Sequence, residues 1–202
     1  MPPRLDDLLA HIAQLEREVE GELAQAREKW RYRLDAGRVR FERDVRQAHA
    51  RLRQSVPRFI RESQPRNLIT APVIYSLIVP IALLDLWISL YQAICFPIYG
   101  IALVRRSRFI AIDRHHLGYL NAIERVNCDY CGYANGVFAY VREVAARTEQ
   151  YWCPIRHARH IRSPHLLYRN FVDYGDAAGY QRRLPLLRQD LKDSKPQPNS
   201  GG

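Results

Sequence analysis

Three cysteines and one histidine are the residues of this chain whose types and spacing are suited to chemistry. Cys128 and Cys131 form a C-x2-C pair, and Cys153 and His157 form a C-x3-H pair further along the sequence. Zinc binds thiolates and imidazoles, and three thiolates with one imidazole complete a closed tetrahedral structural site. Residues spaced like Cys153 and His157 share one face of a helix, and Gly132 would let the backbone bend under the first two sulfurs. The sequence therefore predicts one zinc ion held by Cys128, Cys131, Cys153 and His157.

The length of the helix between the two pairs decides whether this single site can form. If residues 134–150 make one unbroken helix, it is about 25 Å long at 1.5 Å per residue, and Cys131 and Cys153 lie at its opposite ends. The single site therefore requires a shorter helix whose flanks fold back. The alternatives are a divided arrangement, in which Cys153 lies beside the histidine pair His115–His116, and a module that binds no metal.

The same four residues are also compatible with a redox or electron-transfer role. Iron or an iron–sulfur cluster uses similar ligands, and Cys128 and Cys131 can also cycle between thiols and a disulfide. A nucleophile pair of Cys153 and His157 is disfavoured because no acidic partner or oxyanion-forming loop is evident. Four protein ligands would leave no open position for substrate water, so the sequence favours a structural role over catalysis.

The elements that must position these ligands are predicted to be helices. Arg108–Asn127 and Ala134–Gln150 are expected to form two of them, the second capped by Asn135. Trp152–His160 is expected to open a third element, with Pro154 at a permitted first-turn position. Aromatic side chains along these elements would pack a small core.

An apolar run is the strongest single signal in the chain. Between Leu68 and Val104 the only charged residue is Asp85. The run exceeds the roughly 20 residues that a bilayer span needs, and a carboxylate in the middle of one span would be costly. A hairpin would place Asp85 at its turn and keep both arginine-rich flanks on one side. The run is therefore predicted to be a membrane-inserted helical hairpin, with a single span as the alternative.

The N-terminal region is predicted to be one long amphipathic, coiled-coil-like helix over residues 1–62. Apolar residues recur at steps of three or four from Leu5 to Phe59, with an average period of about 3.6 residues. Gly37 is the expected point of any break. Because the apolar stripe is narrow, the helix needs a partner, which can be a second copy, the rest of this chain or the membrane surface.

The formal net charge of +10 allows several classes of partner. Basic proteins attract nucleic acid, anionic lipid or acidic proteins. Next to an apolar run, anionic lipid headgroups are the favoured partner. Nucleic acid is disfavoured, because an RNA-binding platform needs aromatic residues alternating on strands, and no such strands are evident. Cys95 lies within the apolar run and is not counted as a ligand.

Several short stretches resemble a family of uncharacterised bacterial membrane-associated proteins that carry CxYCGY and EQYWCPIxH motifs. The stretches that carry the resemblance are Tyr91–Gly100, Asp113–Leu117, Asn127–Tyr133 and Arg147–Ala158. The resemblance covers about residues 70–175 and leaves out the N-terminal helix. It implies a bacterial inner-membrane setting and no known activity, and it transfers no site residue.

The expected fold class is mainly α, with a long N-terminal helix, a membrane-inserted hairpin and a small helical Cys/His module facing the cytoplasm. The expected boundaries are 1–67, 68–104 and 105–189, followed by a disordered tail over 190–202. The expected function is that of a membrane-embedded scaffold or interaction protein with a zinc-stabilised module. The N-terminal helix would offer a surface for a protein partner or a second copy. The alternative is a membrane-bound redox or electron-transfer protein that uses iron or a cycling Cys pair.

Overall fold

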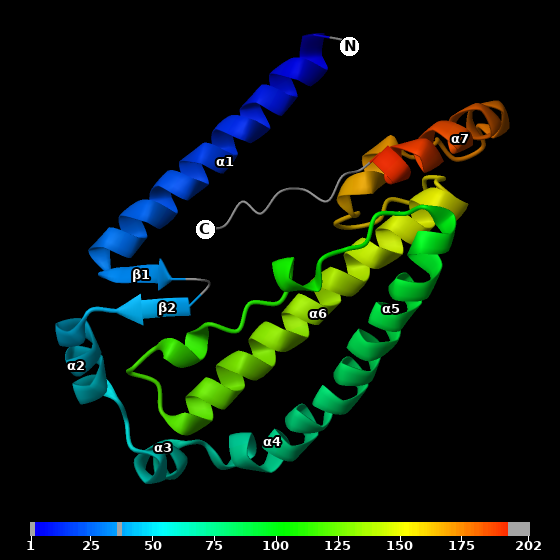
Figure 1. The fold of residues 1–202 in the computed structure, drawn as a ribbon. Coiled ribbons are helices and arrows are strands. Elements are labelled where there is room, and N and C mark those ends of the chain that lie inside the picture. Colours follow the sequence, from blue (N-terminus) through cyan, green and yellow to red (C-terminus); the bar gives the residue numbers. More distant parts are fainter. Residues whose placement is uncertain (1–2, 36–37, 194–202) are drawn as a thin grey trace.

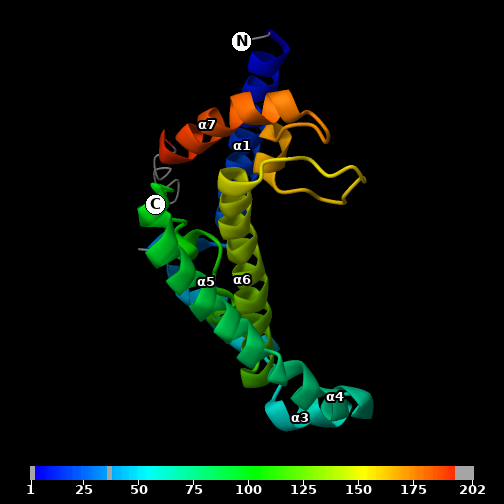
Figure 2. The same ribbon diagram turned by 90° about the vertical axis from the view of Figure 1, so that its right-hand side faces the viewer.

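The computed structural model describes residues 3–35 and 38–193, and it is mainly helical (Figure 1), which confirms the predicted fold class at that level. Its longest helices are α1 (Pro3–Lys29), α5 (Ile78–Tyr99) and α6 (Ala122–Trp152). Helices α5 and α6 lie side by side, whereas α1 lies apart from them (Figures 1 and 2).

The prediction of one helix over residues 1–62 is wrong. Helix α1 ends at Lys29, and an antiparallel hairpin of β1 (Tyr32–Asp35) and β2 (Arg38–Phe41) follows it. The expected break at Gly37 lies outside the described residues. Beyond the hairpin the chain is helical again.

The sequence of the hairpin explains why the helical period fails here. The backbone register pairs Tyr32 with Phe41 and Leu34 with Val39, and in the sequence of both strands apolar residues alternate with charged ones. Such an alternation with period two favours strands over a helix. The two helices that follow are α2 (Arg43–Leu52) and α3 (Val56–Glu62).

The apolar run forms two consecutive helices, α4 (Pro65–Ser76) and α5, which meet at Leu77. The chain does not reverse at Asp85, which lies inside α5, so the expectation of a hairpin that turns there is wrong. Within the described residues, Pro65–Tyr99 is the one helical stretch that is long and apolar enough to cross a membrane, and 11% of its most apolar window is buried.

Residues 101–121 carry the chain back along α5 and are called the return connection here. The connection holds two single-turn 3-10 helices, η1 (Arg106–Arg108) and η2 (Arg114–His116), so the predicted helix Arg108–Asn127 is wrong up to Asn121. Helix α6 then runs parallel to α5. Hydrogen bonds to α6 follow the chain order from α4 into α5, in the pairs Tyr75–Asn127 from α4 and Ser89–Tyr140 and Tyr91–Thr148 from α5.

Helix α6 begins earlier than predicted and is unbroken. Asn121 accepts hydrogen bonds from the backbone N–H groups of Ile123 and Glu124, while the Glu124 carboxylate accepts one from the backbone N–H of Asn121. This capping box satisfies N–H groups that would otherwise lack partners. The predicted cap at Asn135 is wrong, because Asn135 is an interior residue whose side chain donates to the Cys131 carbonyl.

The C-terminal part folds over the end of α6. Pro154 does not open a helix as predicted, since the following strand-like segment pairs Ile155 with Val172 in a parallel bridge. The chain continues through η3 (Leu166–Asn170) to α7 (Ala177–Asp193). Positions 190–193 of the expected disordered tail are therefore helical, and positions 194–202 lie outside the described residues.

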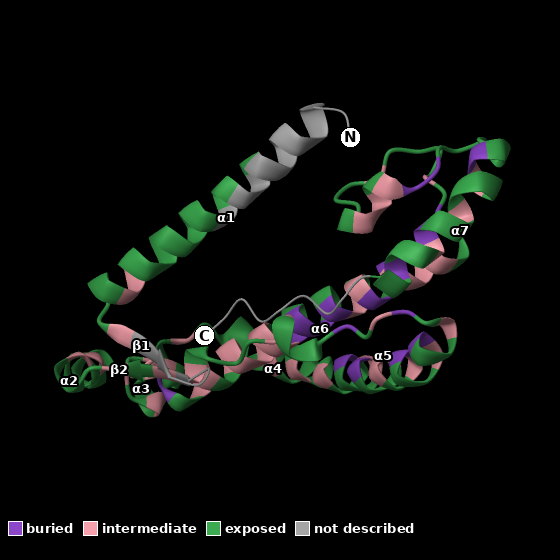
Figure 3. Cartoon of the chain, turned by 45° about the horizontal axis from the view of Figure 1, so that its top comes forward, coloured by how far each residue is buried: buried purple, intermediate pink, exposed green. Residues whose placement is uncertain are grey.

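The buried residues concentrate where α5, α6, α7 and the return connection meet (Figure 3). The main cluster consists of Phe96, Ile101, Val104, Tyr140, Val144 and Leu191. A second cluster lies nearer the start of α6 and contains Ile81, Ala134 and Val137. The apolar run and the region after it thus share one core.

Candidate functional site

The exposed side of α5 is entirely apolar. These exposed positions, at 3.6 residues per turn, occupy an arc of about 160°. Exposed apolar residues of α4 continue this surface up to Leu77. We call the combined surface the outward face. It comprises Leu68, Ile69, Val73, Ile74, Leu77, Val79, Pro80, Ala82, Leu83, Leu86, Trp87, Leu90, Ala93, Ile94, Pro97 and Ile98.

The inner side of α5 holds its polar groups. Its four buried residues are Ile81, Asp85, Gln92 and Phe96, so two of the four are polar. A helix on the surface of a soluble protein shows the opposite distribution, with its apolar stripe on the core and its polar residues in solvent. Helix α5 therefore directs Asp85 and Gln92 into the protein and exposes only apolar residues.

Asp85 is neutralised by a residue of the return connection. The Arg106 guanidinium donates from Nε and Nη2 to the two carboxylate oxygens of Asp85, at 2.9 Å and 2.6 Å, and the Tyr133 hydroxyl donates to Oδ2 at 2.9 Å. A fork of this kind is among the stronger hydrogen-bonded ion pairs. The bond to Asp85 raises the pKa of Arg106, while burial and then the bond to Asp85 raise the pKa of Tyr133. The carboxylate in the apolar run thus has its partners inside the protein.

Gln92 forms hydrogen bonds with the backbone of the return connection. Its amide group donates to the Val104 carbonyl at 3.2 Å, and its carbonyl oxygen accepts from the Val104 N–H at 3.0 Å. The same amide contacts the Tyr140 hydroxyl, which also lies 3.2 Å from the Ser89 hydroxyl. Buried backbone groups outside helices and sheets need such partners. The polar residues of α5 therefore hold the return connection in place.

Two glycines of α6 let the return connection approach closely. A Cβ at Gly136 would lie 2.7 Å from the Phe109 carbonyl oxygen, and one at Gly132 would lie 3.1 Å from the Ala111 carbonyl oxygen. The expectation that Gly132 bends the backbone under two sulfurs is wrong, because it lies within unbroken helix. The C-x2-C-G sequence reflects helix packing at this position.

The structure does not bring the four predicted metal ligands together. Cys128 and Cys131 lie near the start of α6, whereas Cys153 caps its end and His157 follows. At 1.5 Å per residue the helix separates Cys131 from Cys153 by about 33 Å. Among the described residues no group of three or more His, Cys, Asp or Glu side chains is placed to hold a metal ion. The condition for the single site, a shorter helix, is not met, and the residues do not fit one ion.

The divided arrangement is not formed either. His115 lies 3.4 Å from Asp129, measured from Nδ1 to Oδ1, and its ring centroid lies 4.0 Å from that of His116. The histidine pair therefore lies beside the beginning of α6, whereas Cys153 lies at the other end of the helix. Residues Cys95, Cys128, Cys131 and Cys153 are free thiols, and Cys131 and Cys153 are exposed.

A cleft that the sequence analysis missed lies between the N-terminal hairpin, α2 and the return connection. It has a volume of about 700 Å³. Consecutive ring contacts join Tyr32, Phe41, His49 and Tyr119, with centroids 5.6 Å, 5.1 Å and 5.1 Å apart. These rings fasten the hairpin to the return connection. The alternation of aromatic and charged residues after Trp30 was the available signal.

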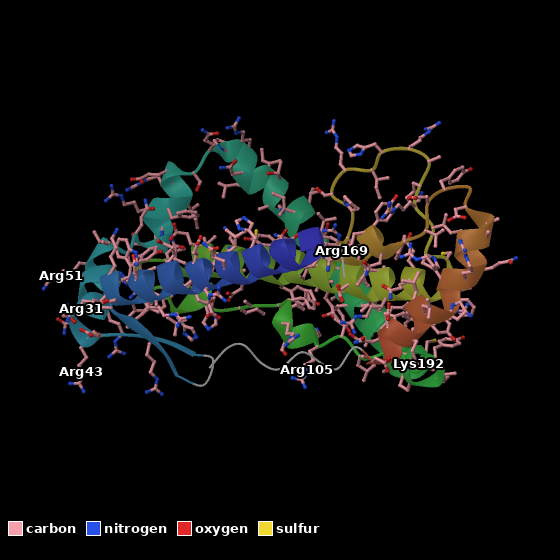
Figure 4. All side chains as sticks on the ribbon, turned by 90° about the horizontal axis from the view of Figure 1, so that it is seen from above. Arg31, Arg43, Arg51, Arg105, Arg169 and Lys192 are labelled. Atoms are coloured by element: carbon pink, nitrogen blue, oxygen red, sulfur yellow. The ribbon has the colours of Figure 1, made fainter. Side chains whose placement is uncertain are left out.

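Basic side chains are spread along the molecule. Arg31 and Arg43 lie at the end formed by the hairpin and α2, Arg105 lies on the return connection, and Lys192 lies at the α7 end (Figure 4). A nucleic-acid interface usually has its basic side chains clustered in one patch. The cations labelled in Figure 4 are not clustered in this way. The apolar outward face is the more distinctive surface.

Comparison with known proteins gives no relative from which a function can be transferred. No family model, curated protein or solved structure matches the chain. Its function must be argued from its own surfaces.

Proposed function

We propose that this protein is a membrane-attached scaffold or interaction protein, and that the outward face of α4 and α5 enters the lipid. The observation that carries the proposal is the reversed polarity of α5, whose exposed residues are all apolar while Asp85 and Gln92 are buried. Fully burying a Val, Leu or Ile side chain contributes roughly 1.5–3 kcal/mol relative to leaving it in water. A surface with this many large apolar side chains therefore needs an apolar environment.

The other surfaces of the protein suit water and protein partners. Helix α6 exposes Asn135 and Arg142. Helix α1 exposes Leu15, Val19 and Leu23 at steps of four residues among charged neighbours. An exposed stripe of this kind can pack against a partner helix or a second copy. Attachment through α5 would present α1 to such partners at the membrane.

The proposal includes no shared zinc or iron site, because α6 holds the four predicted ligands apart. The resemblance to bacterial membrane-associated proteins would place the chain at an inner membrane, and the arginine-rich flanks of the apolar run would favour the cytoplasmic side. The proposal itself requires a bilayer and no specific compartment. Anionic headgroups would add attraction for a chain of net charge +10.

Vesicle flotation tests the proposal. The unaltered protein should float with vesicles of phosphatidylethanolamine and phosphatidylglycerol, and it should stay bound in high salt and alkaline carbonate. Leu83→Asp combined with Leu90→Asp should weaken binding by at least about 100-fold, because an aspartate costs up to about 3 kcal/mol in hydrocarbon and 1.4 kcal/mol is a factor of ten.

The matched control places the same charges on the exposed side of α6. Asn135→Asp combined with Ala139→Asp should leave flotation within about a factor of two of the unaltered protein, since neither position belongs to the outward face. Release of the unaltered protein by salt alone would contradict the proposal. So would a protein that is soluble and monomeric without lipid or detergent.

A further inference from the structure

We infer that α4 and α5 lie in the plane of the membrane within one leaflet and do not cross it. The inference rests on the proposed membrane attachment and adds its geometry. The partner surface is a lipid leaflet, which contacts the outward face and no other side of α5. Three features of the structure support this orientation over a span.

The first feature is the return connection, which lies beside the middle of α5. Arg106 pairs with Asp85, which is near the midpoint of Ile78–Tyr99, and the Arg106 side chain is 47% exposed. Residues 105–108 are all exposed, and three of them are arginines. An upright α5 would carry this irregular, cationic segment through hydrocarbon. Irregular backbone exposed to lipid does not occur at that depth, because its polar groups would have no partners.

The second feature is the helix that packs beside α5. Helix α6 carries charged residues along its length, including Asp129, Arg142 and the ion pair of Glu143 with Arg147. Arg142 is exposed. Because α6 runs parallel to α5 and touches it, a span by α5 would pull these groups into the bilayer, where each charge is costly. An α5 that lies flat keeps them on the aqueous side.

The third feature is dimension. Helix α5 alone has 22 residues and is about 33 Å long at 1.5 Å per residue, so an upright α5 would use the whole hydrocarbon thickness of about 30 Å and leave the exposed apolar residues of α4 outside the bilayer. An interfacial helix buries only its apolar side, to a depth of about 5–10 Å. The exposed side of α5, an apolar arc of about 160°, has the shape such a helix needs, and the exposed apolar residues of α4 extend the apolar surface beyond it.

Spin labels on the outward face test the orientation. The four native cysteines are replaced by serine, and this parent protein must still float with vesicles. Single cysteines at Val79, Leu83, Leu90 and Ile94 are then labelled in vesicles of phosphatidylethanolamine and phosphatidylglycerol. Relative accessibility to oxygen and to a nickel chelate measures the depth of each label. A label at Asn135 on α6 is the aqueous control.

The orientations predict different depth profiles. In a flat α5 the four labels have one shared depth of about 5–10 Å below the headgroups. An upright α5 would separate Val79 from Ile94 by about 22 Å along the membrane normal, and such a gradient would overturn the inference while leaving membrane attachment intact. Four labels in an aqueous environment would overturn attachment itself. Labels shielded from both reagents would show that a second copy or another protein covers the face.

Discussion

Helices α5 and α6 touch along their length, yet they distribute polarity in opposite ways. Helix α5 turns its polar residues towards the protein and exposes only apolar ones. Helix α6 buries apolar residues such as Val137 and Val144 and exposes Asn135 and Arg142. The same core thus serves two helices whose outer sides differ in polarity.

The difference shows that hydrophobicity and burial are separate properties in this protein. Helix α5 is the most apolar helix, but most of its apolar surface does not contribute to the core. Asp85 is tolerated because Arg106 and Tyr133 reach it from inside. Comparable substitutions on the inner and outer sides of α5, or on α5 and α6, should therefore have different effects on stability.

The largest contrast is expected between the inner and outer sides of α5. Phe96 is fully buried in the main core cluster, so Phe96→Ala should lower the free energy of unfolding by about 3–5 kcal/mol. Leu86 is 66% exposed on the outward face, so Leu86→Ala should change the free energy of unfolding by less than about 0.5 kcal/mol. Denaturant unfolding in detergent micelles, followed by helical circular dichroism, measures both. Equal losses would mean that the outward face packs against protein.

The next contrast concerns the buried carboxylate. Asp85→Ala removes the acceptor of both Arg106 and Tyr133 and should cost about 2–3 kcal/mol. The cost stays below that of an isolated buried charge because the half-exposed Arg106 can turn to solvent. Tyr133→Phe is the milder variant and should cost about 1 kcal/mol. If Asp85→Ala instead stabilises the protein, the ion pair is not what holds the return connection on α5.

A smaller effect is expected at the contact between α6 and the return connection. Gly136→Ala would place a methyl group 2.7 Å from the Phe109 carbonyl oxygen, so the connection must shift at a cost of about 1–3 kcal/mol. Gly21→Ala is the matched change, since nothing lies within 4 Å of a Cβ there. It should stabilise α1 by up to about 1 kcal/mol through helix propensity. Thermal unfolding of the two variants in parallel would show opposite shifts, and a neutral Gly136→Ala would contradict the close approach.

The sequence predicted some elements and misled about others for identifiable reasons. The apolar run predicted helix from Leu68 onward, whereas the Asn121-x2-Glu124 capping box at the start of α6 was missed. Gly132 was interpreted as a bend beside a metal site, although it is a place where backbone approaches a helix. A glycine that allows the backbone to bend and a glycine that allows another segment to approach closely cannot be told apart in a single sequence.

The position of Asp85 and the distance between the cysteine pairs depend on tertiary structure. Arg106 reaches Asp85 only because the chain returns along α5, and no local pattern encodes that return. The spacing of Cys131 and Cys153 was compatible with one metal site or with two ends of a helix. Helix length decided between them, and the glycines inside α6 obscured it.

The smallest effects are expected from substitutions of the cysteines at the two ends of α6. Because these cysteines are far apart, a change at one should not affect the other. Cys131 and Cys153 are exposed free thiols about 33 Å apart along the helix. Cys131→Ser and Cys153→Ser should each change the free energy of unfolding by less than about 0.5 kcal/mol. Neither change should alter the reactivity of the other thiol towards a maleimide. The metal content of the purified protein, measured by atomic emission, should be the same in both variants as in the unaltered protein. Loss of one equivalent of zinc from both variants would contradict the structure, because shared ligation requires α6 to be broken between residues 131 and 153.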